Sequence, residues 1–106
     1  MFKINGLLWF LEIVPSYSPH LHRSDGSVTI GMCDNEHQTI YIDESLHGPL
    51  LKKVLCHELA HAAMFSYGVD LTIEQEEIVA DIVATYGQEI IKMTNTLFHK
   101  LKNERL

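Results

Sequence analysis

The sequence predicts an α+β fold in which a small N-terminal antiparallel sheet of about three strands packs on two long helices. Residues 1–43 contain short runs of β-branched and aromatic side chains separated by turn-forming residues, which predict strands. Residues 49–101 change to apolar side chains at three- and four-residue spacing, which predicts helices. Strands followed by helices are typical of an α+β domain, and 106 residues predict a single domain, residues 1–106.

The strands are expected in three segments. The run INGLLWFLEIV is rich in β-formers and predicts one or two strands, with turn chemistry at Asn5-Gly6. The next segment, PSYSPHLHRSDG, holds prolines, serines and Asp-Gly and predicts a loop. SVTIGM (residues 27–32) predicts a short strand, CDNEHQ (residues 33–38) a turn, and TIYID (residues 39–43) the second strand of a hairpin.

Two helices follow. Pro49 suits the first turn of a helix over residues 50–67, and Gly68 is a C-terminal cap. Thr72 is the expected N-cap of a second helix that runs from residue 74 to about residue 101. The apolar positions are Leu51, Val54, Leu55, Leu59, Ala62 and Phe65 in the first helix, and Ile78, Ile82, Ile90, Leu97 and Leu101 in the second.

Charge and composition argue against several functions. The net charge of −6 and the absence of a basic stripe indicate that the chain does not bind nucleic acid. Asn5, Gly6 and Glu12 interrupt the apolar N-terminal stretch, so neither a signal peptide nor a membrane span is expected. Two cysteines are too few for a disulfide scaffold. These features predict a cytoplasmic protein with free thiols.

The segment LCHELAHA carries a candidate metal motif. His57 and His61 are four residues apart and share one face of the predicted helix, with Glu58 about 100° round from His57. Two imidazoles suit zinc, and the carboxylate suits a general base. The alternative is an ordinary amphipathic helix with two partly exposed histidines. The small apolar neighbours favour the metal, because buried imidazoles without partners are costly.

A catalytic zinc site needs a third protein ligand. The segment EQEEIVAD places Glu77 and Asp81 on one face of the second helix. If the helices pack antiparallel, Glu77 is expected to bind the metal, and Asp81 to accept the far N–H of a ligand histidine. Glu76 is the alternative third ligand. A solvated acidic helix start is the alternative for the whole segment.

HELAH followed by EEIVAD resembles the gluzincin class of zinc metallopeptidases, whose pattern is HExxH with a downstream ExxxD on a second helix. The size and the order of strands and helices resemble the minimal, single-domain members with a zincin-like core. These include ImmA/IrrE-type domains and small metallopeptidase-like proteins of bacteria and their phages. The matched part runs from roughly Thr39 to Glu89, about half of the chain.

By position, the resemblance implies that His57, His61 and Glu77 bind Zn²⁺, that Glu58 is the general base and that Asp81 supports a ligand histidine. The implied reaction is hydrolysis of peptide bonds by a zinc-activated water. The implied substrate is a peptide or a specific regulatory protein.

The resemblance also implies that residues 39–42 form a strand at the rim of the cleft, where an extended substrate pairs with it. The chain departs from the larger gluzincins, which have Asn before the ligand glutamate, where this chain has Glu76, and an oxyanion donor on a further domain. The alternative function is therefore a catalytically weak or inactive zinc-binding regulatory module. An intact Glu58 favours the enzyme. A third alternative is an accessory domain without metal, and the sequence leaves the oligomeric state open.

Overall fold

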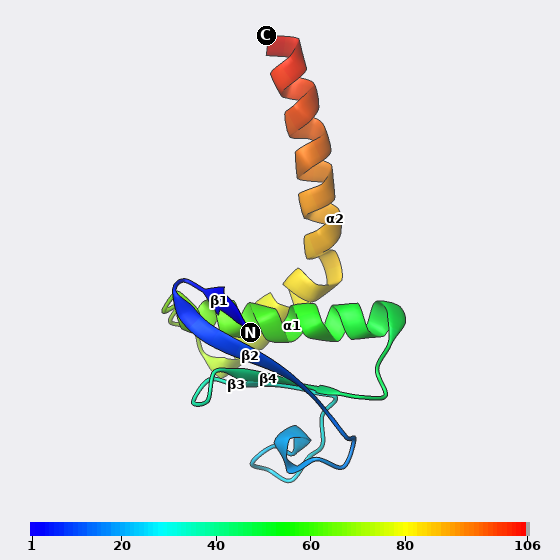
Figure 1. Cartoon of the computed structure of the whole chain (residues 1–106). Coiled ribbons are helices and arrows are strands. Elements are labelled where there is room, and N and C mark those ends of the chain that lie inside the picture. The colour runs from blue at the N-terminus through cyan, green and yellow to red at the C-terminus, as the bar shows by residue number, and fades with distance from the viewer. Residues whose placement is uncertain (106) are drawn as a thin grey trace.

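The computed structural model describes residues 1–105 and contains a four-stranded mixed sheet and two helices, which confirms the α+β class (Figure 1). A short 3-10 helix, η1, lies in the loop between the second and third strands. The elements in chain order are β1 (Phe2–Ile4), β2 (Leu7–Val14), η1 (Pro19–Leu21), β3 (Gly31–Asp34), β4 (Thr39–Asp43), α1 (Gly48–Ser66) and α2 (Ile73–Arg105).

The sheet differs from the predicted one in strand number and direction. Its order is β1-β2-β4-β3, and β2 and β4 are parallel, with Phe10 opposite Thr39 and Val14 opposite Asp43. The prediction of about three antiparallel strands was wrong for two reasons. Asn5 (φ 48°) and Gly6 (φ 77°) close a tight turn that divides the first run into β1 and β2. The loop after β2 is long enough to return the chain for parallel pairing.

The third strand also lies later in the chain than predicted. Residues 27–32 were expected to form it, but β3 is Gly31–Asp34, so that the hairpin turn to β4 is shorter than expected. The residues before β3 bond to the loop instead: the Thr29 amide donates to the Leu21 carbonyl at 2.8 Å, and the Arg23 amide donates to the Ser27 carbonyl at 2.8 Å. These bonds close the loop on itself, and its Leu21 packs with Val14 and Tyr41 on the face of the sheet away from α1.

The central strand is β4, and all five of its residues are buried. Ile40 and Ile42 face α1, where they pack with Trp9 and Ala62. The expectation that residues 39–42 form the rim of the cleft was wrong, because β4 has a partner strand on each side. The free edge nearest the helices belongs to β3.

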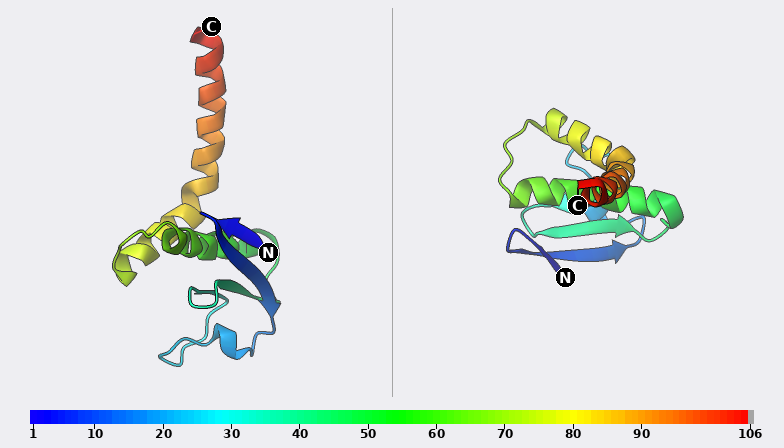
Figure 2. Two further views of the ribbon diagram at one scale, coloured as in Figure 1. Left: turned by 60° about the vertical axis from the view of Figure 1, so that its left-hand side comes forward. Right: turned by 90° about the horizontal axis from the view of Figure 1, so that it is seen from above.

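Helix α1 lies across one face of the sheet (Figure 2). It begins at Gly48, with Pro49 in its first turn as predicted, and the chain leaves it through Gly68 at a positive φ of 65°. Its far end is tied to the first hairpin, since the Trp9 indole N–H donates to Ser66 Oγ at 2.8 Å and Asn5 Nδ2 donates to the Ser66 carbonyl at 2.9 Å.

Helix α2 begins with a reciprocal cap. Thr72 Oγ1 accepts from the Gln75 amide, and Gln75 Oε1 accepts from the Thr72 amide, both at 3.1 Å, which confirms Thr72 as the N-cap. The first turns of α2 run back along α1, and the helix then projects away from the rest of the molecule (Figures 1 and 2). Within residues 1–105, neither helix is long and apolar enough to cross a membrane.

Candidate metal centre

The two histidines of the HELAH motif converge on one point. His57 and His61 lie on successive turns of α1, and their side chains are 20% and 12% exposed. Their Nε2 atoms are 3.2 Å apart, and the two rings meet at 66°. The helix period alone puts both rings on one face, and packing of α2 against that face holds them there.

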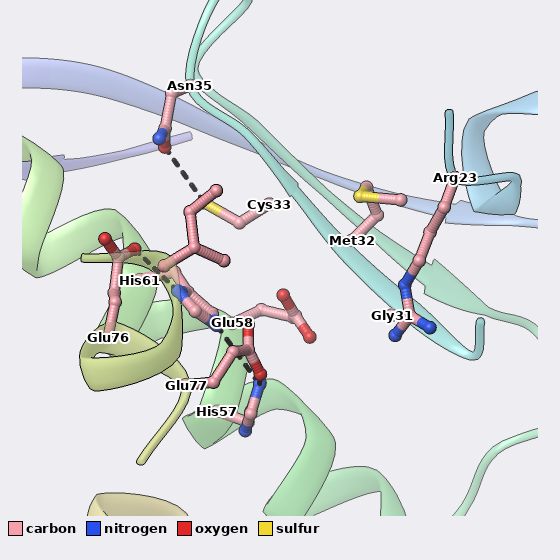
Figure 3. A pocket seen from close by; sticks show the side chains of 11 residues that line it. Arg23, Gly31, Met32, Cys33, Asn35, His57, Glu58, His61, Glu76 and Glu77 are labelled. Carbon is pink, nitrogen blue, oxygen red and sulfur yellow. Dashed lines mark hydrogen bonds and ion pairs between the residues drawn. The ribbon is translucent and has the colours of Figure 1, made fainter. Parts of the chain in front are cut away.

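The third group at this point is Glu77, from the start of α2 (Figure 3). Glu77 Oε1 lies 2.8 Å from His61 Nε2, and Oε2 lies 3.3 Å from His57 Nε2. Each of the three residues offers one ligand atom, and these atoms all lie within 4.8 Å of one another. Helix packing therefore unites residues that are twenty positions apart in the chain.

The outer nitrogen of each imidazole meets another carboxylate. Asp81 Oδ1 lies 3.0 Å from His57 Nδ1, and Glu76 Oε1 lies 2.7 Å from His61 Nδ1. A carboxylate at Nδ1 keeps the proton on that nitrogen, so the lone pair of Nε2 points to the common centre. Asp81 lies where the sequence reasoning put it. Glu76, which was weighed as a third ligand or as a solvated residue, instead supports His61.

This donor set fits a zinc ion. Adjacent ligand atoms of a tetrahedral zinc ion lie about 3.3 Å apart, given bonds of about 2.0–2.2 Å. The nitrogen–nitrogen separation of 3.2 Å and the two nitrogen–oxygen separations of 2.8 and 3.3 Å are close to that value. A bound cation would accept both Nε2 lone pairs and neutralise the Glu77 carboxylate; without one, a proton on an imidazole joins the same atoms. Three protein ligands would leave a fourth position open to water or substrate.

Glu58 is buried beside the histidines, with only 8% of its surface exposed. Burial raises the pKa of its carboxyl group, and the nearby charges of His57 and His61 oppose that rise. Strand β3 covers it: a Cβ atom on Gly31 would lie 3.2 Å from Glu58 Oε2 and 2.6 Å from Val54 Cγ1. Glycine at position 31 thus lets the strand pass directly over the carboxylate.

The side chains of His57, His61 and Glu77 open into a pocket of about 270 Å³ between β3 and the two helices (Figure 3). Arg23 is the one cationic side chain in its wall apart from the histidines, and it has no ion-pair partner among residues 1–105. The residues that line the pocket are Arg23, Gly31, Met32, Cys33, Asn35, His57, Glu58, His61, Ile73, Glu76 and Glu77.

Strand β3 forms one wall of this pocket and is the outer strand of the sheet. The Asp43 amide donates to the Ile30 carbonyl, so the backbone groups of Met32, two residues on, also point toward β4. The backbone of Gly31 and Cys33 consequently faces outward along the free edge. Of these outward groups, the Gly31 carbonyl already accepts a bond from the Thr29 hydroxyl at 3.1 Å.

Six residues of the pocket wall were not predicted from the sequence: Arg23, Gly31, Met32, Cys33, Asn35 and Ile73. A glycine inside a strand-forming run is a signal of close backbone approach, and it could have identified Gly31. Burial, and then the charges of Glu58, Glu76 and Asp34, raise the pKa of the Cys33 thiol to about 12. Cys33 therefore lines the pocket as a neutral thiol. Cys56 lies elsewhere, toward the Val83 carbonyl of α2.

Comparison of the chain with protein-family models, with curated proteins and with solved structures finds no match.

Proposed function

We propose that this chain is a zinc-dependent metallopeptidase of the gluzincin type. One observation carries the proposal: His57 Nε2, His61 Nε2 and the Glu77 carboxylate converge beside the buried Glu58, at the base of an open pocket. A purely structural metal site has no use for a fourth polar group of this kind. A general base needs a carboxylate close to the metal and shielded from bulk water.

Each residue of the site has a distinct task in this proposal. A bound zinc ion would acidify a water molecule and polarise a carbonyl group. Glu58 receives the proton of the attacking water and returns it to the amine that leaves. Asp81 and Glu76 hold the imidazoles in the tautomer that offers Nε2.

The proposed substrate is a peptide or an extended segment of a protein. The free edge of β3 runs along the pocket, and an extended chain can add to such an edge through backbone hydrogen bonds. Arg23 and Asn35, at the pocket wall, supply the side-chain donors available to a substrate carbonyl or carboxylate.

A zinc-binding regulatory module is the second candidate. Among the residues that line the pocket there is no tyrosine, and no histidine besides His57 and His61, to stabilise an oxyanion. This lining favours weak catalysis, whereas the burial of Glu58 favours the enzyme.

The first test is the metal content of the untagged, purified chain by mass spectrometry. We expect one zinc ion per chain, loss of that zinc in Glu77→Ala, and its retention in Glu58→Gln. Absence of zinc after metal is added back would overturn the proposed centre.

Catalysis is tested separately on a peptide library. We expect Glu58→Gln to abolish a cleavage that the wild-type chain performs, because the other two carboxylates of the pocket lining, Glu76 and Glu77, already contact the histidines. Zinc binding with no cleavage by the wild-type chain would select the regulatory module.

A further inference from the structure

The projecting part of α2 carries an apolar stripe that the rest of the chain does not cover. The stripe consists of Val83, Tyr86, Ile90, Met93, Leu97 and Leu101, with Ile91 and Phe98 on its flank. These side chains are between 37% (Val83) and 65% (Phe98) exposed. In Figure 1 and in the left view of Figure 2 the far end of α2 stands clear of the sheet and of α1.

Such a helix needs a partner. Residues 84–105 extend about 33 Å, and in proteins most of the stability of a helix comes from packing of its apolar face rather than from intrinsic propensity. The stripe repeats at three- and four-residue steps from Val83 to Leu97, which is the pattern of a helix that packs against another helix. Each large apolar side chain that stays half-exposed lacks part of the hydrophobic stabilisation that burial would provide.

We propose that a second copy of this chain covers the stripe, with the two α2 helices antiparallel about a two-fold axis near residue 95. The stripe is self-complementary about that point. The midpoint between Met93 and Leu97 is position 95, and the midpoint between Ile90 and Leu101 is position 95.5. A two-fold axis there places Met93 of each copy against Leu97 of the other, and Ile90 against Leu101. This interface is independent of the proposed metal chemistry.

The charges select the same axis. The midpoint between Glu89 and Lys100 is position 94.5. The two residues are eleven positions apart, a separation that puts them on the same side of the helix to within about 20°. In an antiparallel pair this flank meets the same flank of the other copy, so Glu89 lies beside Lys100 of the partner twice. Lys100 also approaches Glu104 of its own helix at 4.0 Å, an exposed contact of little strength.

A parallel pair lacks this match. It would bring the basic ends of both helices together, with Lys100, Lys102 and Arg105 of each copy side by side. It would also align the two helix dipoles, whereas an antiparallel pair opposes them.

The same register fills an apolar groove at the base of the projecting helix. This groove has a volume of about 680 Å³ and is lined by Cys56, Val83, Gly87, Gln88, Ile90, Ile91, Lys92 and Asn95. With the axis near residue 95, Leu101 of the partner falls at the level of residue 89, beside the groove. Leu101 of the partner thus reaches the groove beside Ile90, a lining residue that the groove shares with the stripe.

The test is sedimentation velocity of the full chain between about 5 and 200 µM. We expect a dimer of twice the 12.1 kDa monomer mass, and at least a tenfold increase in the dissociation constant for Leu97→Lys. Ile13→Lys is the matched control, because Ile13 is 59% exposed and Leu97 51%, and Ile13 lies in β2 outside the interface. Circular dichroism of each variant checks that it folds.

The orientation is tested by charge reversal. Glu89→Lys is expected to weaken the dimer about three- to tenfold, as is Lys100→Glu, and the double reversal is expected to restore it. A monomer at every concentration would assign the stripe to a different partner and overturn the proposal. A dimer that is unaffected by Leu97→Lys, or a double reversal that fails to restore association, would overturn it as well.

Discussion

At the scale of single residues, the candidate centre depends on which nitrogen of each imidazole carries the proton. Asp81 and Glu76 each meet an Nδ1 atom, so both Nε2 atoms face Glu77. The supporting carboxylates lie on the same helix as the third ligand, one before Glu77 and one a turn beyond it. Two turns of α2 therefore set the tautomers and complete the ligand set together.

The two adjacent glutamates are expected to differ in their effect on metal binding. Glu77→Ala removes a ligand, whereas Glu76→Ala removes only the acceptor for His61 Nδ1, a loss of about 10- to 100-fold in affinity. Zinc affinities from competition with a chromogenic chelator should therefore fall further for Glu77→Ala. Glu74→Ala, in the exposed first turn, is the control. The reverse order of the two variants would make Glu76 the ligand.

The thiol of Cys33 is expected to react slowly with alkylating reagents. The pKa of the Cys33 thiol is raised from 9.0 to about 12, so the thiol stays neutral. The fraction of thiolate at pH 8 is therefore about 1000-fold smaller than for an ordinary cysteine. In the metal-free Cys56→Ser variant, the rate of alkylation by iodoacetamide should rise about tenfold per pH unit from pH 7 to 10. A plateau near pH 9 would show an ordinary thiol.

At the scale of elements, the contact between β3 and α1 decides where the candidate base lies. Gly31 passes over Val54 and Glu58 at a distance that leaves no room for a side chain. The edge strand therefore both shields Glu58 from water and forms the wall along which a substrate is proposed to lie.

Gly31→Ala is expected to loosen the contact between β3 and α1. The new methyl group would lie 2.6 Å from Val54 Cγ1, which overpacks the contact and should lower the free energy of unfolding by about 1–3 kcal/mol. Zinc content should persist, because position 31 touches none of the proposed ligands. Gly87→Ala is the control: its Cβ would meet only Val83 Cγ1 at 3.5 Å, so urea unfolding should show no loss. Unchanged stability of Gly31→Ala would contradict the close approach.

The sequence could predict the parts of the site that depend on the helix period. His57 and His61 share a face because they are four residues apart, and the Glu77–Asp81 pair follows the same rule on α2. It could not predict contacts made by the sheet, because strand order depends on pairing between distant segments. The insertion of β4 between β2 and β3, and the arrival of Arg23 at the pocket, are of this second kind.

At the scale of the whole molecule, the shape is set by the projecting part of α2. The principal extents are 56 × 31 × 27 Å, and the radius of gyration is 16.2 Å, against about 13 Å for a compact chain of this length. The core and the candidate site lie at one end, since the two buried clusters involve only residues before position 63. The far half of α2 contributes to neither.

The projecting helix is therefore expected to be dispensable for metal binding. A chain that ends at Gly87 keeps all the proposed ligands and their supporting carboxylates, and its zinc affinity should match that of the full chain within about twofold. Isothermal titration with zinc compares the two chains. A loss above tenfold would show that the distal turns support the site.

Because the proposed ligands are divided between two helices, a bound metal would fix the angle between α1 and the base of α2. His57 and His61 belong to the body of the molecule, whereas Glu77 belongs to the helix that projects from it. From Asp81 to Arg105 the helix extends roughly 36 Å, so a tilt of about 5° at its base moves the tip by roughly 3 Å. Binding of a metal at the base of α2 would thus determine the direction in which the projecting part of the helix points.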